Sequence, residues 1–178
     1  MKKKIFIING STKGGKDTFV SLVTTELNDI NKRFHTVINY DSVGRLKVFE
    51  KEINRNVEEA NNKTERYRKF LSDLKNLTDE YCDLSFKDIC DVVNVFNSDN
   101  NEALVLFIHI REPKNIERAV KELAAKTVLV KNKNAKLITS NESDKNIFNY
   151  EYNYVINNNG SIDDLRNEVK KFVQEVIL

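Results

Sequence analysis

The sequence is poor in proline, glycine, cysteine and tryptophan: its 178 residues include one, five, two and none of these, respectively. The single proline excludes a proline-rich linker, and the length predicts one domain with a sizeable core. Cys82 and Cys90 have no metal-binding spacing with the two histidines. We therefore expect free thiols in the reducing cytoplasm, and a regulatory disulfide stays open as the alternative.

A strong charge of one sign is also missing, because the net charge is only +2. No stripe of basic and aromatic residues stands out, so we expect no nucleic-acid partner. Lys2–Lys4 precede the apolar run Ile5–Ile8, which is too short for a signal peptide or a membrane span. We therefore expect no membrane partner either, and 40% hydrophobic with 31% charged residues is typical of a globular protein.

Three of the five glycines lie together in the segment Gly10–Asp17, between an apolar run and a helical pattern. A strand, a glycine-rich turn and a helix that begins with lysine form the P-loop of nucleotide-binding proteins, which holds phosphate oxygens on backbone N–H groups. Lys16 adds a mobile cation for the β- and γ-phosphates. Asp17 replaces the Ser or Thr whose hydroxyl usually contacts Mg²⁺, and Thr18 follows one position late. A simple turn is the alternative, and the strand–loop–helix order argues against it.

Strand-like and helix-like segments alternate along the chain, which predicts an α/β fold of three layers with a five-stranded, mostly parallel sheet. The seven-residue run 104–110, apolar except for His109, is typical of an interior strand. We expect a P-loop NTPase fold in a single domain of residues 1–178, with a helical insertion at about 43–100. The expected strands are 4–9, 34–40, 104–110, 127–130 and 154–156.

Helix ends and helix faces follow from local patterns. Thr64 is the expected N-cap of an insertion helix, and Ser85–Asp88 and Ser161–Asp164 are expected capping boxes. Apolar residues at helical spacing predict three buried faces. They are Phe19, Val23, Leu27 and Ile30; then Tyr67, Phe70, Leu71, Leu74 and Leu77; and finally Ile162, Leu165, Val169, Phe172 and Val176.

The carboxyl ends of parallel strands share one edge of a sheet, and ligands bind there. We therefore expect the P-loop, the segment 40–47 and Arg111 to meet at that edge. With these elements in this order, the chain resembles P-loop small-molecule kinases, namely the phage-type deoxynucleoside monophosphate kinases and, more distantly, the animal-type phosphomevalonate kinases. The matching segments are Gly15–Thr18 (GKDT), Arg45–Lys47, Tyr67–Lys69, Ile110–Asn115, Val128–Ala135, Ser140–Glu142 and Tyr154–Gly160.

The resemblance implies the nucleotide-kinase type of this fold, with a lid at about 131–146. It implies phosphoryl transfer from ATP, with Mg²⁺, to a small-molecule acceptor that carries a phosphate, most specifically a (deoxy)nucleoside monophosphate. It implies catalytic roles for Lys16, Lys47, Arg68 and Arg111, and Asp17 as the metal ligand. Gly10, Lys13, Gly14, Gly15, Lys16, Asp17, Thr18 and Lys133 are the residues expected at the donor nucleotide. A monomer and a homodimer are both compatible with the pattern, and no motif distinguishes ATP from GTP.

Three positions depart from the family pattern: His109 stands where the family has Asp, Arg45 replaces a proline, and the lid lysines 131, 133 and 136 come without an arginine. His109 is expected to be a hydrogen-bonded strand-end residue, with Glu112 as a substitute metal ligand. Two alternatives stay open. One is a kinase of a hydroxyl acceptor with Asp41 as general base, although Asp41 is also a candidate helix cap. The other is a nucleotide-binding protein without transferase activity.

Overall fold

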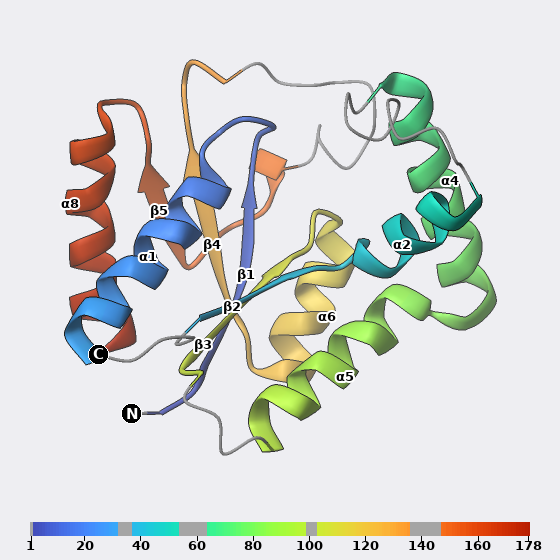
Figure 1. Cartoon of the computed structure of the whole chain (residues 1–178), viewed down its shortest axis with the longest axis horizontal. Coiled ribbons are helices and arrows are strands. Elements are labelled where there is room, and N and C mark those ends of the chain that lie inside the picture. The colour runs from blue at the N-terminus through green and yellow to red at the C-terminus, as the bar shows by residue number, and fades with distance from the viewer. Residues whose placement is uncertain (1, 32–36, 54–63, 99–102, 136–146) are drawn as a thin grey trace. The chain divides into compact units, whose positions relative to one another are not determined.

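The computed structural model describes residues 2–31, 37–53, 64–98, 103–135 and 147–178 (Figure 1). The chain divides into two compact units. The sheet unit comprises the residues up to Tyr40 together with Val95–Leu178, and the helical unit is Asp41–Asn94. Residues 34–36, Lys136, Ser140–Glu142 and most of the expected lid lie outside the described residues.

Five strands form one sheet in the order β2-β3-β1-β4-β5. Its pairings of β1 with β3 and β4, and of β4 with β5, are parallel, with Ile8 opposite His109 and Gly10 opposite Val130. The expected five-stranded α/β sheet is therefore confirmed, and β3 is an interior strand as its apolar run predicts. The strands are β1 (Lys4–Gly10), β2 (Val37–Asp41), β3 (Val105–His109), β4 (Lys126–Lys131) and β5 (Tyr154–Asn157).

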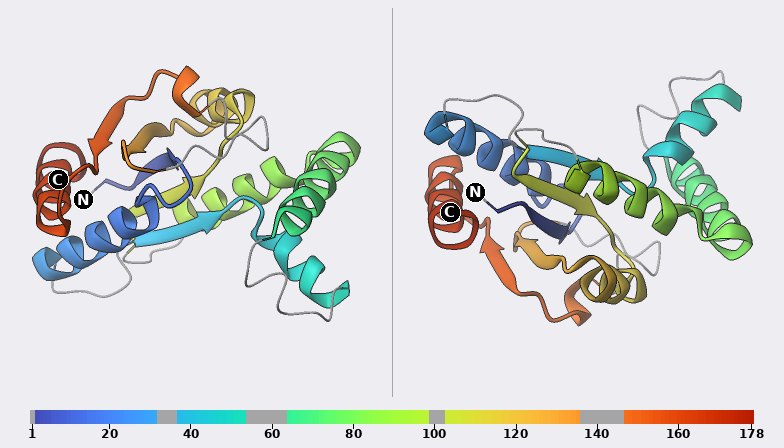
Figure 2. Two further views of the ribbon diagram at one scale, coloured as in Figure 1. Left: turned by 90° about the horizontal axis from the view of Figure 1, so that it is seen from above. Right: turned by 90° about the horizontal axis from the view of Figure 1, so that it is seen from below.

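The helices of the sheet unit cover both faces of the sheet, which makes three layers; α1 and α6 lie on opposite sides of β1 in both views of Figure 2. On the α1 side, Phe6 of β1 lies against Phe107 at 5.5 Å and Phe172 at 5.3 Å between ring centroids. Ile116 and Ala119 of α6 are buried as well. The helices are α1 (Lys16–Asn31), α6 (Pro113–Leu123) and α8 (Ile162–Phe172), with a short 3₁₀ turn η1 (Ile147–Asn149) and a π turn η2 (Val173–Ile177).

Two of the predicted helix faces are wrong at one end. Ile30, near the end of α1, and Ile162, the first residue of α8, are both exposed. Periodicity predicts which side of a helix is apolar, but not how far along the helix that side is covered by other residues. At the other end of α8 the chain widens into η2, and Val173 and Ile177 are buried there. The capping box of Ser161 with Asp164 is confirmed.

Three helices are described in the helical unit and at its border: α2 (Gly44–Ile53), α4 (Glu65–Cys82) and α5 (Leu84–Ser98). A small core joins Leu46 to Tyr67 and Leu71, with Leu74 packed against it. Thr64 is the N-cap of α4, because its hydroxyl accepts a hydrogen bond from the N–H of Tyr67 at 3.2 Å. Phe70 and Leu77 are exposed, so the predicted face of α4 is wrong at these two positions.

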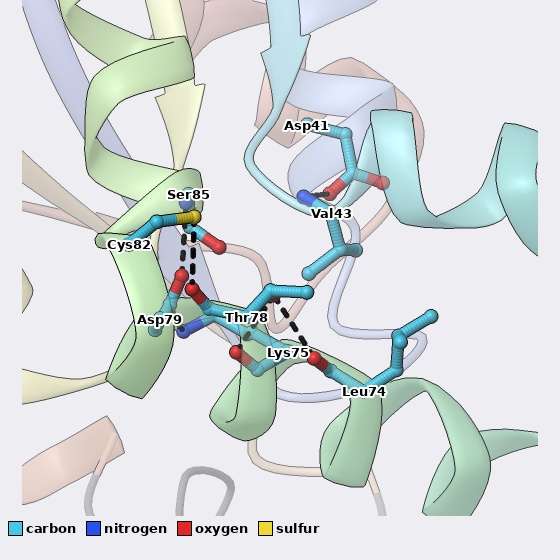
Figure 3. Close-up of polar contacts among 8 residues, drawn as sticks. All are labelled: Asp41, Val43, Leu74, Lys75, Thr78, Asp79, Cys82 and Ser85. Carbon is cyan, nitrogen blue, oxygen red and sulfur yellow. Dashed lines mark hydrogen bonds and ion pairs between the residues drawn. The ribbon is translucent and has the colours of Figure 1, made fainter.

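The capping box predicted at Ser85 is wrong. Asp83 has left-handed backbone angles, φ 55° and ψ 40°, and lets α5 begin already at Leu84. The N–H of Ser85 is satisfied by Asp79 Oδ1 of the preceding helix at 2.8 Å, while Asp79 Oδ2 pairs with Lys75 at 2.8 Å (Figure 3). Asp79 thus replaces the expected cap and holds the junction between α4 and α5.

Cys82 and Cys90 are free thiols, as expected. Cys82 Sγ donates to the carbonyl oxygen of Thr78 at 3.3 Å (Figure 3). Of the helices in the described ranges, none combines the length and the apolar character needed to cross a bilayer.

Candidate functional site

The turn between β1 and α1 has the backbone of a tight phosphate-binding loop. The N–H of Gly14 donates to Ser11 O at 2.8 Å, and the N–H of Phe19 donates to Gly15 O at 2.8 Å, which starts the helix. Lys13 and Gly15 both have positive φ, 60° and 93°. A positive φ is ordinary for glycine but uncommon for lysine, and such residues cluster at functional sites, so the loop holds Lys13 in a conformation that this residue rarely adopts.

At two of the loop glycines there is also no room for a side chain. A Cβ built on Gly10 would lie 2.6 Å from the carbonyl oxygen of Val130 in β4. One built on Gly14 would lie 2.8 Å from both the carbonyl oxygen and the hydroxyl of Ser11. Both distances are well below a van der Waals contact, so any side chain at these positions would displace backbone. The loop therefore keeps its backbone bare and able to approach a ligand closely.

The polar groups of the loop fit an oxyanion. Ser11 Oγ and Thr12 Oγ1 are buried and have no hydrogen-bond partner within the described part of the chain. Buried hydroxyls are almost always paired, so an unpaired couple in one loop is an observation that a bound acceptor of hydrogen bonds would explain. The Lys16 side chain is 16% exposed and its Nζ lies 3.5 Å from Oδ2 of Asp17, which is 76% exposed. Thr18 is exposed too.

Asn9 fixes the entry to the loop. This side chain is 1% exposed, and its Oδ1 accepts the N–H of Gly10 at 2.9 Å. Its Nδ2 donates to Tyr152 Oη at 3.0 Å, and Tyr152 Oη donates in turn to Ile147 O at 2.9 Å. Burial raises the pKa of Tyr152 to about 12, so this phenol stays protonated at physiological pH. Sequence reasoning assigned no role to either residue.

Asn158 contacts the loop from the other side. Its Nδ2 donates to Gly14 O at 2.9 Å, and its N–H donates to Lys131 O at the end of β4 at 2.8 Å. The neighbouring Asn159 accepts the N–H of Lys133 on Oδ1 at 2.8 Å. The sequence identifies these asparagines only as part of the family-like segment Tyr154–Gly160. Their position beyond a strand end, on the same edge as the P-loop, is the signal that points to them.

The other predicted residues of the sheet unit follow strand ends. Because β1, β3 and β4 are parallel, their carboxyl ends lie at one edge of the sheet. His109 ends β3 and its Nε2 lies 2.6 Å from Asn39 Oδ1, so it is a hydrogen-bonded strand-end histidine as expected. Arg111 lies two residues beyond the end of β3 and is half-buried, and Lys133 lies two residues beyond the end of β4 and is exposed.

Of the predicted acceptor residues, Lys47 and Arg68 belong to the helical unit, as does Asp41, whereas Arg111 belongs to the sheet unit. Asp41, the last residue of β2, accepts the N–H of Val43 on Oδ1 at 3.2 Å (Figure 3) and forms an ion pair with Lys47 through Oδ2. This hydrogen bond holds the turn immediately before α2, which begins at Gly44. Burial, reinforced by Glu50 and then Asp41, raises the pKa of Tyr67, which precedes the half-buried Arg68 on α4.

Comparison with known proteins identifies the fold. Neither a protein-family model nor a curated protein sequence matches the chain. Solved structures do match: dephospho-CoA kinase from Campylobacter jejuni at TM-score 0.54 and 15% identity, over 98% of both chains; TT1252 from Thermus thermophilus at 0.52 and 16%, over 99% of both; and shikimate kinase from Aquifex aeolicus at 0.50 and 14%, over 96% of both. The chain has the P-loop kinase fold. At such low identity, the likeness extends to the fold alone.

Across the described ranges, no group of three or more His, Cys, Asp or Glu side chains could hold a metal ion. Mg²⁺ at a phosphoryl-transfer site does not need such a group, because it keeps several waters and binds one or two protein oxygens and the substrate phosphates. The exposed carboxylate of Asp17, directly at the loop, fits that requirement.

Proposed function

We propose that this protein transfers the γ-phosphoryl group of ATP to a small phosphorylated acceptor, most specifically a (deoxy)nucleoside monophosphate. The observation that carries the proposal is the P-loop, with two positive φ angles, glycines that no side chain can replace, and the buried hydroxyls of Ser11 and Thr12. The P-loop kinase fold and the family-like segments support it. The chain is proposed to be a single kinase domain in which residues 43–100 bind the acceptor and 131–146 form the lid.

On the donor side, the loop from Gly10 to Gly15 would hold the phosphates of ATP on its N–H groups, at the positive end of α1. Lys16 would neutralise charge on the β- and γ-phosphates, and Lys133 would approach them from the segment after β4. Asp17 would hold Mg²⁺ directly or through water. The metal supplies charge neutralisation at the bridging phosphate oxygens, and phosphoryl transfer needs little beyond this and correct positioning.

On the acceptor side, Lys47, Arg68 and Arg111 would hold the acceptor phosphate and the migrating group, since cationic side chains suit phosphate oxygens. In this structure Lys47 is paired with Asp41. A phosphate acceptor must therefore compete with the Asp41 carboxylate for the lysine, which would make Asp41 a determinant of acceptor affinity.

A second candidate is a kinase whose acceptor is a hydroxyl group. Asp41 is a carboxylate at the end of β2, paired with Lys47, and in this candidate it would serve as the general base. Two of the similar structures are titled dephospho-CoA kinase and shikimate kinase, neither of which is named for a nucleoside monophosphate. A phosphate acceptor needs no base at neutral pH, because its second pKa is about 6.

The experiment is ADP release from MgATP or MgGTP with a panel of ribo- and deoxynucleoside monophosphates, phosphomevalonate, nucleosides, shikimate and dephospho-CoA. The enzymes are the wild type, Lys16→Ala, Asp41→Asn and, as a matched control, Lys170→Ala, which removes an exposed lysine of α8. We expect turnover with one monophosphate, lost by about 100-fold or more in Lys16→Ala, in line with the removal of one group that stabilises the transition state.

Asp41→Asn separates the two candidates. With a phosphate acceptor its kcat should stay within about tenfold of the wild type, whereas loss of a general base costs about 10²–10⁴. Nucleotide binding without acceptor-dependent ADP release would identify a nucleotide-binding protein without transferase activity. Absence of any nucleotide binding in the wild type would refute the proposal.

A further inference from the structure

The loop that follows β5 joins two segments that are far from it in sequence. Asn158 donates its side-chain N–H to Gly14 O in the P-loop, 144 positions away, at 2.9 Å, and its backbone N–H to Lys131 O at 2.8 Å. Asn159 accepts the N–H of Lys133 at 2.8 Å. One dipeptide therefore binds both the phosphate loop and the segment after β4.

The bond to Gly14 O bears on phosphate binding through the geometry of the peptide group. The C=O of Gly14 and the N–H of Gly15 belong to one planar trans peptide unit and point in opposite directions. Fixing the carbonyl toward Asn158 therefore fixes the N–H of Gly15 away from it. Both residues of this unit are glycines, and Gly15 has φ 93°, so the unit has few steric constraints of its own.

The packing around Gly15 indicates that the asparagine and the glycine are fitted to each other. A Cβ built on Gly15 would lie 2.1 Å from Asn158 Nδ2. The amide thus occupies the space that any other residue at this position would need. Its hydrogen bond of 2.9 Å to Gly14 O is possible because position 15 has no side chain.

We propose that Asn158 is a positioning residue that sets the orientation of the Gly14–Gly15 peptide, so that the N–H of Gly15 is preorganised for a nucleotide phosphate. The inference rests on the proposed function, because it gives a task to the P-loop N–H groups. Asn158 acts through Gly14 and takes no part in phosphoryl transfer. Asn159, in the same loop, also holds the backbone at Lys133. The loop after β5 therefore contacts both the P-loop and the segment after β4.

The test compares Asn158→Ala and Asn158→Asp with Asn157→Ala and Asn157→Asp. Asp has the shape of Asn but turns an oxygen toward Gly14 O, so it removes the donor without a change in volume. Asn157, the last residue of β5, has an exposed side chain with no hydrogen bond to the described residues, and its substitutions change charge and composition identically. Two quantities are measured: the Kd of MgATP by calorimetry, and amide hydrogen exchange of residues 11–16 without nucleotide.

We expect Asn158→Ala to weaken MgATP binding by about three- to tenfold, the value of one neutral hydrogen bond, and Asn158→Asp to weaken it further through repulsion. Exchange at Gly14, whose N–H donates to Ser11 O, should accelerate by a similar factor, while the β1 amides keep their wild-type rates. The Asn157 variants should stay within about twofold of the wild type. A merely structural role of Asn158 would instead lower the melting temperature and accelerate exchange throughout the sheet unit.

Wild-type affinity together with wild-type P-loop exchange in both Asn158 variants would overturn the inference and leave the proposed function intact. Equal losses in Asn157→Asp and Asn158→Asp would overturn it as well, because they would assign the effect to charge alone. If the wild-type protein bound no nucleotide, the proposed function would fail, and faster exchange confined to residues 11–16 would still decide whether Asn158 orders the loop.

Discussion

Replacement of Gly10 by alanine tests the packing of the P-loop against the sheet, independently of any ligand. Gly10 is the last residue of β1 and pairs with Val130 of β4. The new Cβ would lie 2.6 Å from the carbonyl oxygen of Val130. Because that oxygen belongs to the backbone of an interior strand, the clash can be relieved only if β1 or β4 moves.

Forced overpacking of this kind costs about 1–3 kcal/mol, and the smaller conformational entropy of alanine in the unfolded chain returns about 0.4–1 kcal/mol. We therefore expect Gly10→Ala to lower the free energy of unfolding by roughly 1–2 kcal/mol, which for a chain of this size lowers the melting temperature by about 2–8 °C. Urea unfolding and calorimetry measure both quantities.

The matched substitution is Gly44→Ala, because a Cβ on Gly44, the first residue of α2, would meet nothing within 4 Å. The same chemical change should there be neutral or stabilise by up to about 1 kcal/mol. If Gly10→Ala were as stable as the wild type, or if the two variants changed in the same direction by the same amount, the close approach of Gly10 to β4 would be refuted.

Two further predictions concern pH. Tyr152→Phe should cost about 1 kcal/mol at pH 7, because Asn9 loses a hydrogen-bond partner. Burial raises the pKa of Tyr152 to about 12, from about 10 in the unfolded chain. The stability that this shift contributes is present below about pH 10 and is lost between about pH 10 and about pH 12. The free energy of unfolding of Tyr152→Phe should therefore lack this part of the decline with pH. Burial alone would raise the pKa of Asp79, but the hydrogen bonds from Lys75 and Ser85 outweigh it and lower that pKa. Asp79→Asn should therefore cost about 1–2 kcal/mol at pH 7, and the difference from the wild type should shrink as pH falls below about 4; a constant difference would refute the role of the ionised carboxylate.

Much of the fold was predictable because its signals are local. The apolar run of β3 requires burial on both faces wherever it lies, and the caps at Thr64 and Ser161 depend on residues within one turn. The failures occur where distant structure decides. Ile30 and Ile162 have the right phase for burial but lie near helix ends, where they are exposed.

The false capping box at Ser85 has a different cause. A sequence pattern identifies a side chain that can accept the N–H groups of a helix start, but not whether another acceptor is already there. Asp79 comes from the helix before, and its carboxylate reaches the N–H of Ser85 because Asp83 turns the chain with a left-handed residue. That contact depends on the angle between α4 and α5, which cannot be predicted from the sequence pattern.

The candidate site also has a part that the sequence predicts and a part that it does not. The P-loop follows from spacing, because its chemistry requires small residues and a lysine at fixed positions. Asn9, Tyr152 and Asn158 are joined to it by bonds that span up to 144 positions, and no periodicity places an asparagine opposite a carbonyl group at that separation. Their signal exists only once the strand order puts β5 and β1 on either side of β4.

Asn9 and Asn158 limit the conformational freedom of the glycine-rich loop. A loop rich in glycine can bring its backbone close to phosphate, but it also has the most conformational freedom to lose when it binds. Asn9 fixes the N–H of Gly10 at the start of the loop, and Asn158 fixes the carbonyl of Gly14 near its end. With both ends held, less ordering would remain to be done when the proposed nucleotide binds, so more of the phosphate interaction would be retained as affinity. It follows that the strength of this P-loop is set partly outside its motif, and that two chains with identical loops but different residues at position 158 should differ in nucleotide affinity.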